Sequence, residues 1–154
     1  MQIKNILIYL DNCCFNRPFD DQNYLSIYLE TEAKLAIQNL IKNDKLKLAW
    51  SFILDYENES NPDEIVKKEI FSWRKLSSSM VYKSPHIIED ANKIISYGIS
   101  NKDALHIASA IKGGADFFIT VDKGIIKKKK LIKKIIILSP IDFVGIIEEV
   151  NNEI

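Results

Sequence analysis

The 154-residue chain is long enough for one domain with a substantial core, and its 47% hydrophobic and 27% charged residues are ordinary for a globular protein. The longest apolar runs are too short to cross a bilayer, and the first residues do not form a signal peptide, so we expect no membrane association and a cytoplasmic location. A formal net charge of zero argues against bulk electrostatic adhesion to nucleic acid.

Lysines are concentrated in one short stretch near the end of the chain. Residues 123–134 carry seven lysines and no acidic residue, whereas residues 1–122 carry 14 basic and 17 acidic residues. Such a lysine strip is usually a solvated surface, but it can also bind phosphate groups. The two cysteines, Cys13 and Cys14, are adjacent and therefore predict neither a disulfide framework nor a zinc site.

Apolar spacing in the first half of the chain predicts strands that alternate with helices. Residues 6–10 are an unbroken apolar run, which is typical of a strand covered on both faces in a parallel sheet. After a polar turn, apolar residues at helical spacing predict a long amphipathic helix over residues 25–41. Residues 46–50 indicate a second strand, and Ser51 is expected to cap a helix that begins at Phe52.

The second half of the chain continues this alternation. A helix with Pro62 in its first turn and a buried stripe to Leu76 comes first, followed by a short extended piece at residues 80–82 and a helix over residues 85–95. The next helix begins with a capping box at residues 100–103 and ends at Gly113 and Gly114. Strands are then expected over residues 117–121 and 135–138, and Ser139 and Pro140 start a final helix. The pattern predicts one α/β domain over residues 1–154 with a mainly parallel sheet.

Two aspartates stand directly after buried strands at opposite ends of the chain. Asp11 follows the strand of residues 6–10, and Asp122 follows the strand of residues 117–121. The carboxyl ends of parallel strands meet at one edge of an open sheet, and ligands bind in the crevice there. Two carboxylates at that edge would repel each other unless a cation lay between them. The alternative is that each aspartate only hydrogen-bonds the turn that follows its strand.

Three further residues have weaker local signals. Asp103 lies in the first turn of a helix, where an acid can cap the helix or face the edge of the sheet. Glu57 alternates with Asp55 and Glu59, so the pattern alone does not separate it from solvated neighbours. His106 lies one turn after Asp103, and a single histidine is more often a packed residue than a ligand.

Several other chemistries lack the residues that they need. No glycine-rich loop joins a strand to a helix, and no Gly-x-Ser-x-Gly elbow is present. Asp11 is not followed at the required spacing by the second aspartate of an aspartyl-phosphate phosphatase. Nucleophilic serine or cysteine chemistry lacks a convincing base. Carboxylates that bind a hard divalent metal remain.

Four segments occur in an order that resembles the PIN-domain ribonucleases, particularly the VapC-like members found as toxins in toxin–antitoxin pairs. These segments are residues 8–22, 51–58, 102–108 and 114–122, and together they span nearly the whole chain. Each segment alone is a weak signal, but four in order are specific. The resemblance implies a single PIN-like domain over residues 1–154, with a three-layer α/β/α sandwich around a mainly parallel central sheet.

The resemblance implies a metal-dependent endoribonuclease that hydrolyses RNA phosphodiester bonds with Mg²⁺ or Mn²⁺. Carried over position by position, the catalytic and metal-binding acids are Asp11, Glu57, Asp103 and Asp122. The resemblance also implies RNA as the substrate, a cognate antitoxin protein as a partner, and a homodimer.

One departure from the family pattern is Asn12, because a threonine or serine usually follows the first aspartate. An amide can still position a water or a phosphate oxygen, so we expect altered detail and retained activity. Four residues are the substrate-binding candidates: Asn12, Arg17, Thr120 and Lys123, the last with other lysines of the strip.

Two other functions stay open at this point. The same fold can serve as a catalytically silent RNA-binding or scaffold protein. Asn12 and the zero net charge are compatible with that hypothesis. A metal-dependent phosphatase that acts on small molecules is the third alternative.

Overall fold

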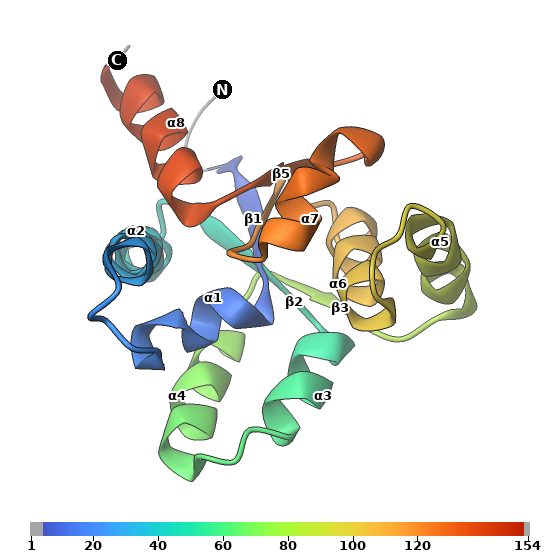
Figure 1. Ribbon diagram of the computed structural model, residues 1–154, viewed down its shortest axis with the longest axis horizontal. Helices are drawn as coiled ribbons and strands as arrows, with labels where there is room; N and C mark the ends of the chain where they lie inside the picture. The colour runs from blue at the N-terminus through green and yellow to red at the C-terminus, as the bar shows by residue number, and fades with distance from the viewer. Residues whose placement is uncertain (1–4, 153–154) are drawn as a thin grey trace.

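Parallel strands form the middle layer of a three-layer α/β/α sandwich (Figure 1). The structure, a computed structural model, describes residues 5–152. The strands lie in the order β3-β2-β1-β4-β5, and their bounds are β1 (Leu7–Leu10), β2 (Lys47–Ser51), β3 (Ser79–Val81), β4 (Phe117–Ile119) and β5 (Ile136–Leu138). Each neighbouring pair is parallel, so the expected fold class is confirmed.

Helices cover both faces of this sheet. On one face α2 (Leu25–Lys42) packs against α8 (Pro140–Asn152), and on the other α5 (Pro85–Ile95) packs against α6 (Asn101–Lys112) (Figure 1). Among residues 5–152, no helix is both long enough and apolar enough to cross a bilayer.

The order of the strands reverses beside β1. The chain runs outward from β1 through β2 to β3, and then returns to place β4 on the other side of β1, with Leu10 opposite Ile119. In open α/β sheets, ligands bind outside the carboxyl ends of the strands at such a switch point. The fold therefore places the ends of β1 and β4 where a ligand site is expected.

Short helices begin immediately after three of the strands. These are α1 (Asn12–Asn16) after β1, α3 (Phe52–Glu59) after β2 and α7 (Lys123–Lys127) after β4. Their N-caps are Asp11, Ser51 and Asp122, whose side-chain oxygens accept from backbone amides in the first turns. The other short elements are the 3-10 helices η2 (Arg17–Phe19) and η3 (Lys129–Leu131) and the helix α4 (Glu64–Arg74).

The centre of the sheet is buried on both faces, as the unbroken apolar runs predict. Ile8, Tyr9 and Leu10 of β1 are fully buried, and the Tyr9 ring stacks on that of Phe118 at 5.5 Å between centroids. Because the aromatic ring fills the core while its hydroxyl still needs a partner, Tyr9 brings a polar atom into an otherwise apolar strand.

Element boundaries differ from the sequence expectations at several places. β4 ends at Ile119 instead of Val121, because Asp122 turns the chain into α7. The helix α4 starts at Glu64 after the cap Asp63, so Pro62 precedes it. The sequence did not predict α1, α7 or η3, because segments this short and polar carry too few apolar residues to reveal a period.

Candidate active site

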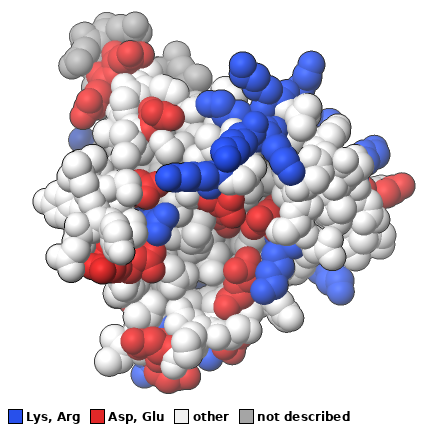
Figure 2. Space-filling view, viewed as in Figure 1, with Lys and Arg blue, Asp and Glu red and all other residues white. Residues whose placement is uncertain are grey.

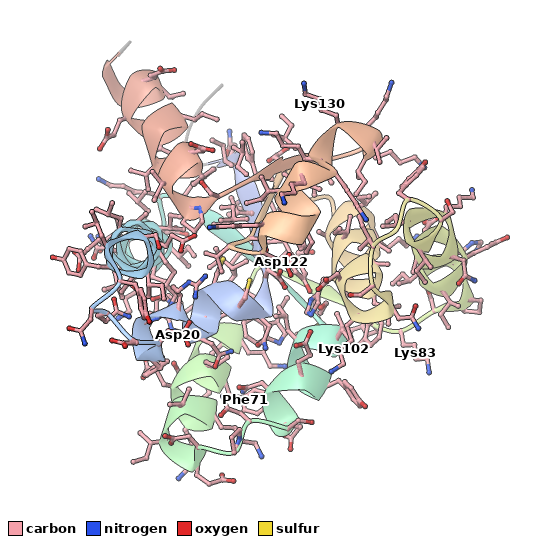
Figure 3. The ribbon with its side chains drawn as sticks, in the orientation of Figure 1. Asp20, Phe71, Lys83, Lys102, Asp122 and Lys130 are labelled. Carbon is pink, nitrogen blue, oxygen red and sulfur yellow. The ribbon has the colours of Figure 1, made fainter. Side chains whose placement is uncertain are left out.

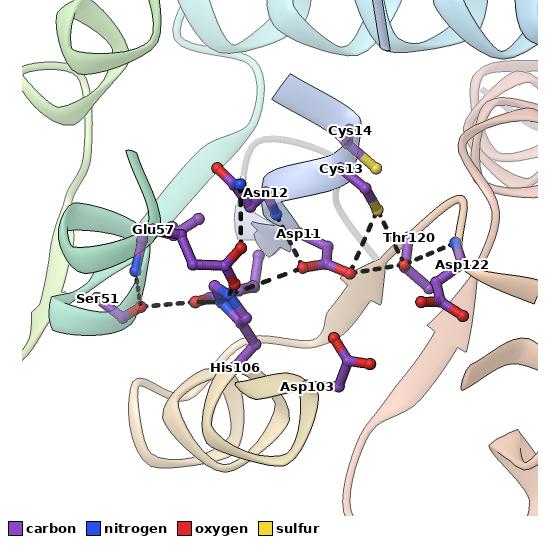
Figure 4. Close-up of polar contacts among 12 residues, drawn as sticks. Asp11, Asn12, Cys13, Cys14, Ser51, Glu57, Asp103, His106, Thr120 and Asp122 are labelled. Atoms are coloured by element: carbon purple, nitrogen blue, oxygen red, sulfur yellow. Dashed lines mark hydrogen bonds and ion pairs between the residues drawn. The ribbon is translucent and has the colours of Figure 1, made fainter. Parts of the chain in front are cut away.

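The candidate site lies beyond the carboxyl ends of β1 and β4 (Figure 4). Asp11 is only 4% exposed, and its backbone amide donates to the Ile119 carbonyl of β4 at 2.9 Å. Its Oδ1 accepts from the Asn12 amide at 2.8 Å, and the Cys13 thiol lies 3.4 Å from its Oδ2. The Asp11 carboxylate is therefore held rigidly at the switch point.

A buried hydroxyl connects Asp11 to Asp122. Thr120 Oγ1 donates to Asp11 Oδ2 at 2.8 Å and accepts from the Asp122 amide at 3.0 Å. Asp122 Oδ1 in turn accepts from the amides of Gly124 and Ile125, at 2.8 and 3.2 Å. The alternative interpretation of the strand-end aspartates is thus also correct: each caps the helix that follows its strand.

Asp103 reaches the same edge from the first turn of α6 (Figure 4). Ser100 caps this helix as expected, with its hydroxyl accepting from the Asp103 amide at 3.4 Å. Burial raises the pKa of the Asp103 carboxyl, and the nearby charges of Asp11 and Asp122 raise it further. Three of the four candidate acids, Asp11, Asp103 and Asp122, therefore face the same edge of the sheet and influence one another electrostatically.

Asp103 and Asp122 also line one small pocket of about 180 Å³. Lys127 and Lys128 also line this pocket, and the Lys128 ammonium donates to the Gly98 carbonyl at 2.6 Å. Gly98 has a φ of +88°, a conformation that glycine adopts without strain. The pocket is thus lined by both acidic and basic side chains.

Glu57 lies on α3 and faces α1 and α6 instead of the pocket. Its Oε2 accepts from the Asn12 side-chain amide at 3.2 Å, and its Oε1 bonds to His106 Nε2. Burial by itself raises the pKa of Glu57, but the hydrogen bond from His106, the positive charge of Lys102 and the hydrogen bond from Asn12 outweigh it and lower the pKa. Glu57 is therefore held as a carboxylate.

Sequence reasoning missed the importance of His106 and Tyr9. His106 is fully buried on α6, and its Nδ1 lies 2.6 Å from the Tyr9 hydroxyl, while its Nε2 lies 4.0 Å from Asp11 Oδ1. The position of His106 one turn after Asp103 was the available signal. No comparable signal marked Tyr9 in the sequence, because a tyrosine inside an apolar strand is usually a core residue.

The substrate-binding candidates lie in different environments. Asn12 and Thr120 belong to the acid cluster, and Lys123 is exposed at the start of α7. Arg17 does not bond to any of the four candidate acids. Its guanidinium pairs instead with Asp20 at 3.0 Å and Glu30 at 3.4 Å, and it is therefore already neutralised.

Basic side chains gather over α7 and the segment that follows it, beside an acidic patch at the centre of the same face (Figure 2). Lys130 extends outward from this region, whereas Asp122 lies at the inner edge (Figure 3). The lysine strip of the sequence is thus a surface next to the candidate acids.

Oxygen donors dominate the site, and this chemistry fits Mg²⁺ or Mn²⁺. Asn12 Oδ1 is buried and has no hydrogen-bond partner, which adds a further unsatisfied oxygen beside the acids. Within residues 5–152, however, no group of three or more acidic, histidine or cysteine side chains is close enough to hold an ion as it stands. Glu57 bonds to His106, and one oxygen of Asp122 caps α7, which accounts for the spread of the carboxylates.

Comparison with known proteins gives structural matches only. No protein-family model and no curated protein matches the sequence. FitAcB from Neisseria gonorrhoeae is matched with a TM-score of 0.56 and 16% identity, over 86% of this chain and 97% of that one. This chain has the PIN-like fold.

Two further structures support the PIN-like fold. VapBC2 from Rickettsia felis, solved bound to a DNA fragment from their promoter, is matched with a TM-score of 0.51 and 19% identity, over 86% of this chain and 97% of that one. VapBC-1 from nontypeable Haemophilus influenzae is matched with a TM-score of 0.53 and 17% identity, over 88% of this chain and 98% of that one. At these identities the likeness concerns the fold.

Proposed function

We propose that this protein is a PIN-domain ribonuclease of the VapC-like class, which hydrolyses RNA phosphodiester bonds with Mg²⁺ or Mn²⁺. The observation that carries the proposal is the convergence of Asp11, Asp103 and Asp122 on one edge of the sheet, at its switch point. Burial and the charges of its two neighbours raise the pKa of Asp103, so the cluster carries negative charge that a divalent cation would neutralise.

Asp11, Asp103 and Asp122 would hold the metal, with Glu57 as the fourth acid. The metal would supply charge stabilisation on the phosphate and a water of lowered pKa. Thr120 fixes the Asp11 carboxylate through its hydroxyl, so Asp11 needs no reorganisation. Glu57 stays ionised through Asn12 and His106, and it is the carboxylate suited to orient the attacking water and accept its proton.

RNA would lie across the lysine strip with its backbone facing the acids. Lys127 and Lys128 line the same pocket as Asp103 and Asp122, and Lys123 is exposed beside Asp122. Lysines at these positions attract phosphates without reading the base sequence. Arg17 would contribute only after leaving Asp20 and Glu30, so the lysines are the main backbone contacts in this proposal.

The same proposal assigns the protein to the toxin half of a toxin–antitoxin pair, with a cognate antitoxin and a homodimeric state. An exposed apolar surface supports a protein partner: the first turn of α2 and the residue before it leave Tyr24 63% and Leu25 71% exposed. Size-exclusion chromatography with light scattering, alone and after co-expression with the protein encoded beside it, tests both states.

RNA cleavage with Mg²⁺ or Mn²⁺ is the experiment that tests the enzyme. Asp11→Asn should abolish cleavage, and so should excess chelator. Asp44→Asn is the matched control, because Asp44 is an exposed turn residue at φ 58°, a conformation that asparagine also tolerates. Full activity of Asp11→Asn, or full activity in excess chelator, would rule out the proposal.

A catalytically silent RNA-binding or scaffold protein is the second candidate. The observation that favours it is that, within residues 5–152, no three acidic, histidine or cysteine side chains lie close enough together to bind one metal ion. Calorimetric titration with Mn²⁺ separates the two. An enzyme site loses its binding isotherm in Asp122→Asn, whereas a scaffold whose acids are only helix caps binds no Mn²⁺ in either protein.

A further inference from the structure

Four side chains form one continuous chain of hydrogen bonds that ends at Glu57 (Figure 4). Ser51 Oγ lies 2.6 Å from Tyr9 Oη, and Tyr9 Oη lies 2.6 Å from His106 Nδ1. His106 Nε2 continues the chain to Glu57 Oε1. Ser51, Tyr9 and His106 are completely buried, so none of their polar atoms can exchange its partner for bulk water.

One assignment of donors and acceptors runs through this chain from end to end. At one end Ser51 Oγ accepts from the Leu54 amide, so its own hydroxyl is free to donate to Tyr9. Tyr9 can then donate to His106 Nδ1, which leaves the imidazole proton on Nε2. At the other end, Nε2–H donates to the Glu57 carboxylate. In this arrangement each of the four side chains has a partner for the polar atoms that form the chain.

Glu57 is consequently held from two sides. His106 donates to Oε1, and the Asn12 amide donates to Oε2 at 3.2 Å. The His106 ring also lies beside Asp11, with Nε2 4.0 Å from Asp11 Oδ1. Packing alone would require none of these polar contacts.

We propose that His106 is a positioning residue that fixes the orientation of the Glu57 carboxylate, and that the Tyr9 hydroxyl acts through it by selecting the imidazole tautomer with the proton on Nε2. The inference rests on the proposed ribonuclease function, because it assigns Glu57 a role in orienting the water. Partners that fix the tautomer and orientation of a site residue contribute about 10- to 100-fold to activity or metal affinity in other metal sites.

The tautomer can be read in the wild-type protein without metal or substrate. We expect nitrogen-15 NMR of the imidazole to show neutral His106 with its proton on Nε2, and we expect Tyr9→Phe to reduce the population of that tautomer. The chain's other histidine, His86, is exposed on α5 and serves as an internal reference. A wild-type His106 with its proton on Nδ1 would overturn the inference, whatever the activity of the protein.

Kinetics of RNA cleavage then test the consequence for Glu57. His106→Leu should lower kcat by about 10- to 100-fold with KM changed by less than about twofold. His106→Gln should recover most of that loss, because its side-chain amide can donate to Glu57 in place of Nε2–H. His86→Gln is the matched control and should leave kcat unchanged. Equal activity of the Leu and Gln variants, both folded by circular dichroism, would show that His106 only packs.

Failure of this inference is distinguishable from failure of the proposed function. A wild-type protein that cleaves no RNA with either metal would refute the ribonuclease, while the tautomer of His106 and the Mn²⁺ affinity of the two His106 variants would still decide whether His106 positions Glu57. A wild-type enzyme with an unchanged His106→Leu variant would refute only the positioning role.

Discussion

Lys34 allows a quantitative prediction from the structure. It lies on the inner side of α2, only 4% exposed, with its ammonium 5.6 Å from the centre of the Phe15 ring. Burial lowers the pKa of Lys34 from its usual 10.5 to about 8, because the opposing charges around it, Glu69 among them, only partly offset the loss of water. Protonated Lys34 therefore destabilises the folded state.

The size of this penalty follows from the two pKa values. At about 1.4 kcal/mol for each pKa unit, the lowering from 10.5 to about 8 corresponds to roughly 3.5 kcal/mol, an upper limit because the side chain can relax toward water. The penalty is fully present below the lowered pKa of the folded state and disappears as pH rises toward 10.5. Between pH 7 and pH 9.5 it should fall from about 3 to about 1.5 kcal/mol.

We therefore predict that Lys34→Met stabilises the protein by up to about 3 kcal/mol at pH 7 and by about half as much at pH 9.5. Urea unfolding of both proteins at the two pH values measures this directly. Lys45→Met, at an exposed turn position, is the control and should stay within about 0.5 kcal/mol of wild type. A destabilised Lys34→Met, or a difference that grows with pH, would refute the reasoning.

Three further predictions concern the candidate site. Asp103→Asn should raise the thermal midpoint of the metal-free protein at neutral pH, because the raised pKa of Asp103 means that its charged form is disfavoured in the folded protein. The gain should vanish in acid, where the carboxyl is protonated in the folded and the unfolded state. A lowered midpoint at neutral pH would contradict this. Thr120→Val should lower the free energy of unfolding in urea by about 1–3 kcal/mol and weaken Mn²⁺ binding in calorimetry, because the Asp11 carboxylate and the Asp122 amide lose their shared partner. Thr120→Ser keeps the hydroxyl and should restore both the stability and the Mn²⁺ affinity. Lys127→Met should weaken RNA binding and reduce the slope of log K against log salt by about 0.7 if Lys127 contacts one phosphate of single-stranded RNA; an unchanged slope would remove it from the interface.

The strand-end aspartates were predictable because the signal that marks them is local. An unbroken apolar run identifies a buried strand, and the residue that follows it must lie at the edge of the sheet. Asp11 and Asp122 therefore needed no knowledge of their neighbours. The sequence also predicted that Ser100 caps α6, since capping depends on residues three positions apart.

Glu57 and His106 could not be paired in this way. They lie 49 positions apart, on helices that meet only when α3 and α6 pack together, and no local pattern distinguishes Glu57 from Asp55. The structure separates them by their partners: Asp55 accepts from the Trp50 indole at 2.8 Å and pairs with Arg74, while Glu57 turns toward Asn12 and His106. Asn12, which departs from the family pattern, thereby has a definite contact.

The sequence by itself determined the class of the fold, the strands that carry the site, and the acidic character of the site, because apolar periodicity and strand ends are properties of neighbouring residues. Only the tertiary structure decided which acids face the same edge of the sheet, which one is hydrogen-bonded to a histidine, and which basic groups already pair with acidic residues. Those outcomes depend on burial and on distances between residues far apart in the chain, and both are set when the helices close over the switch point between β1 and β4.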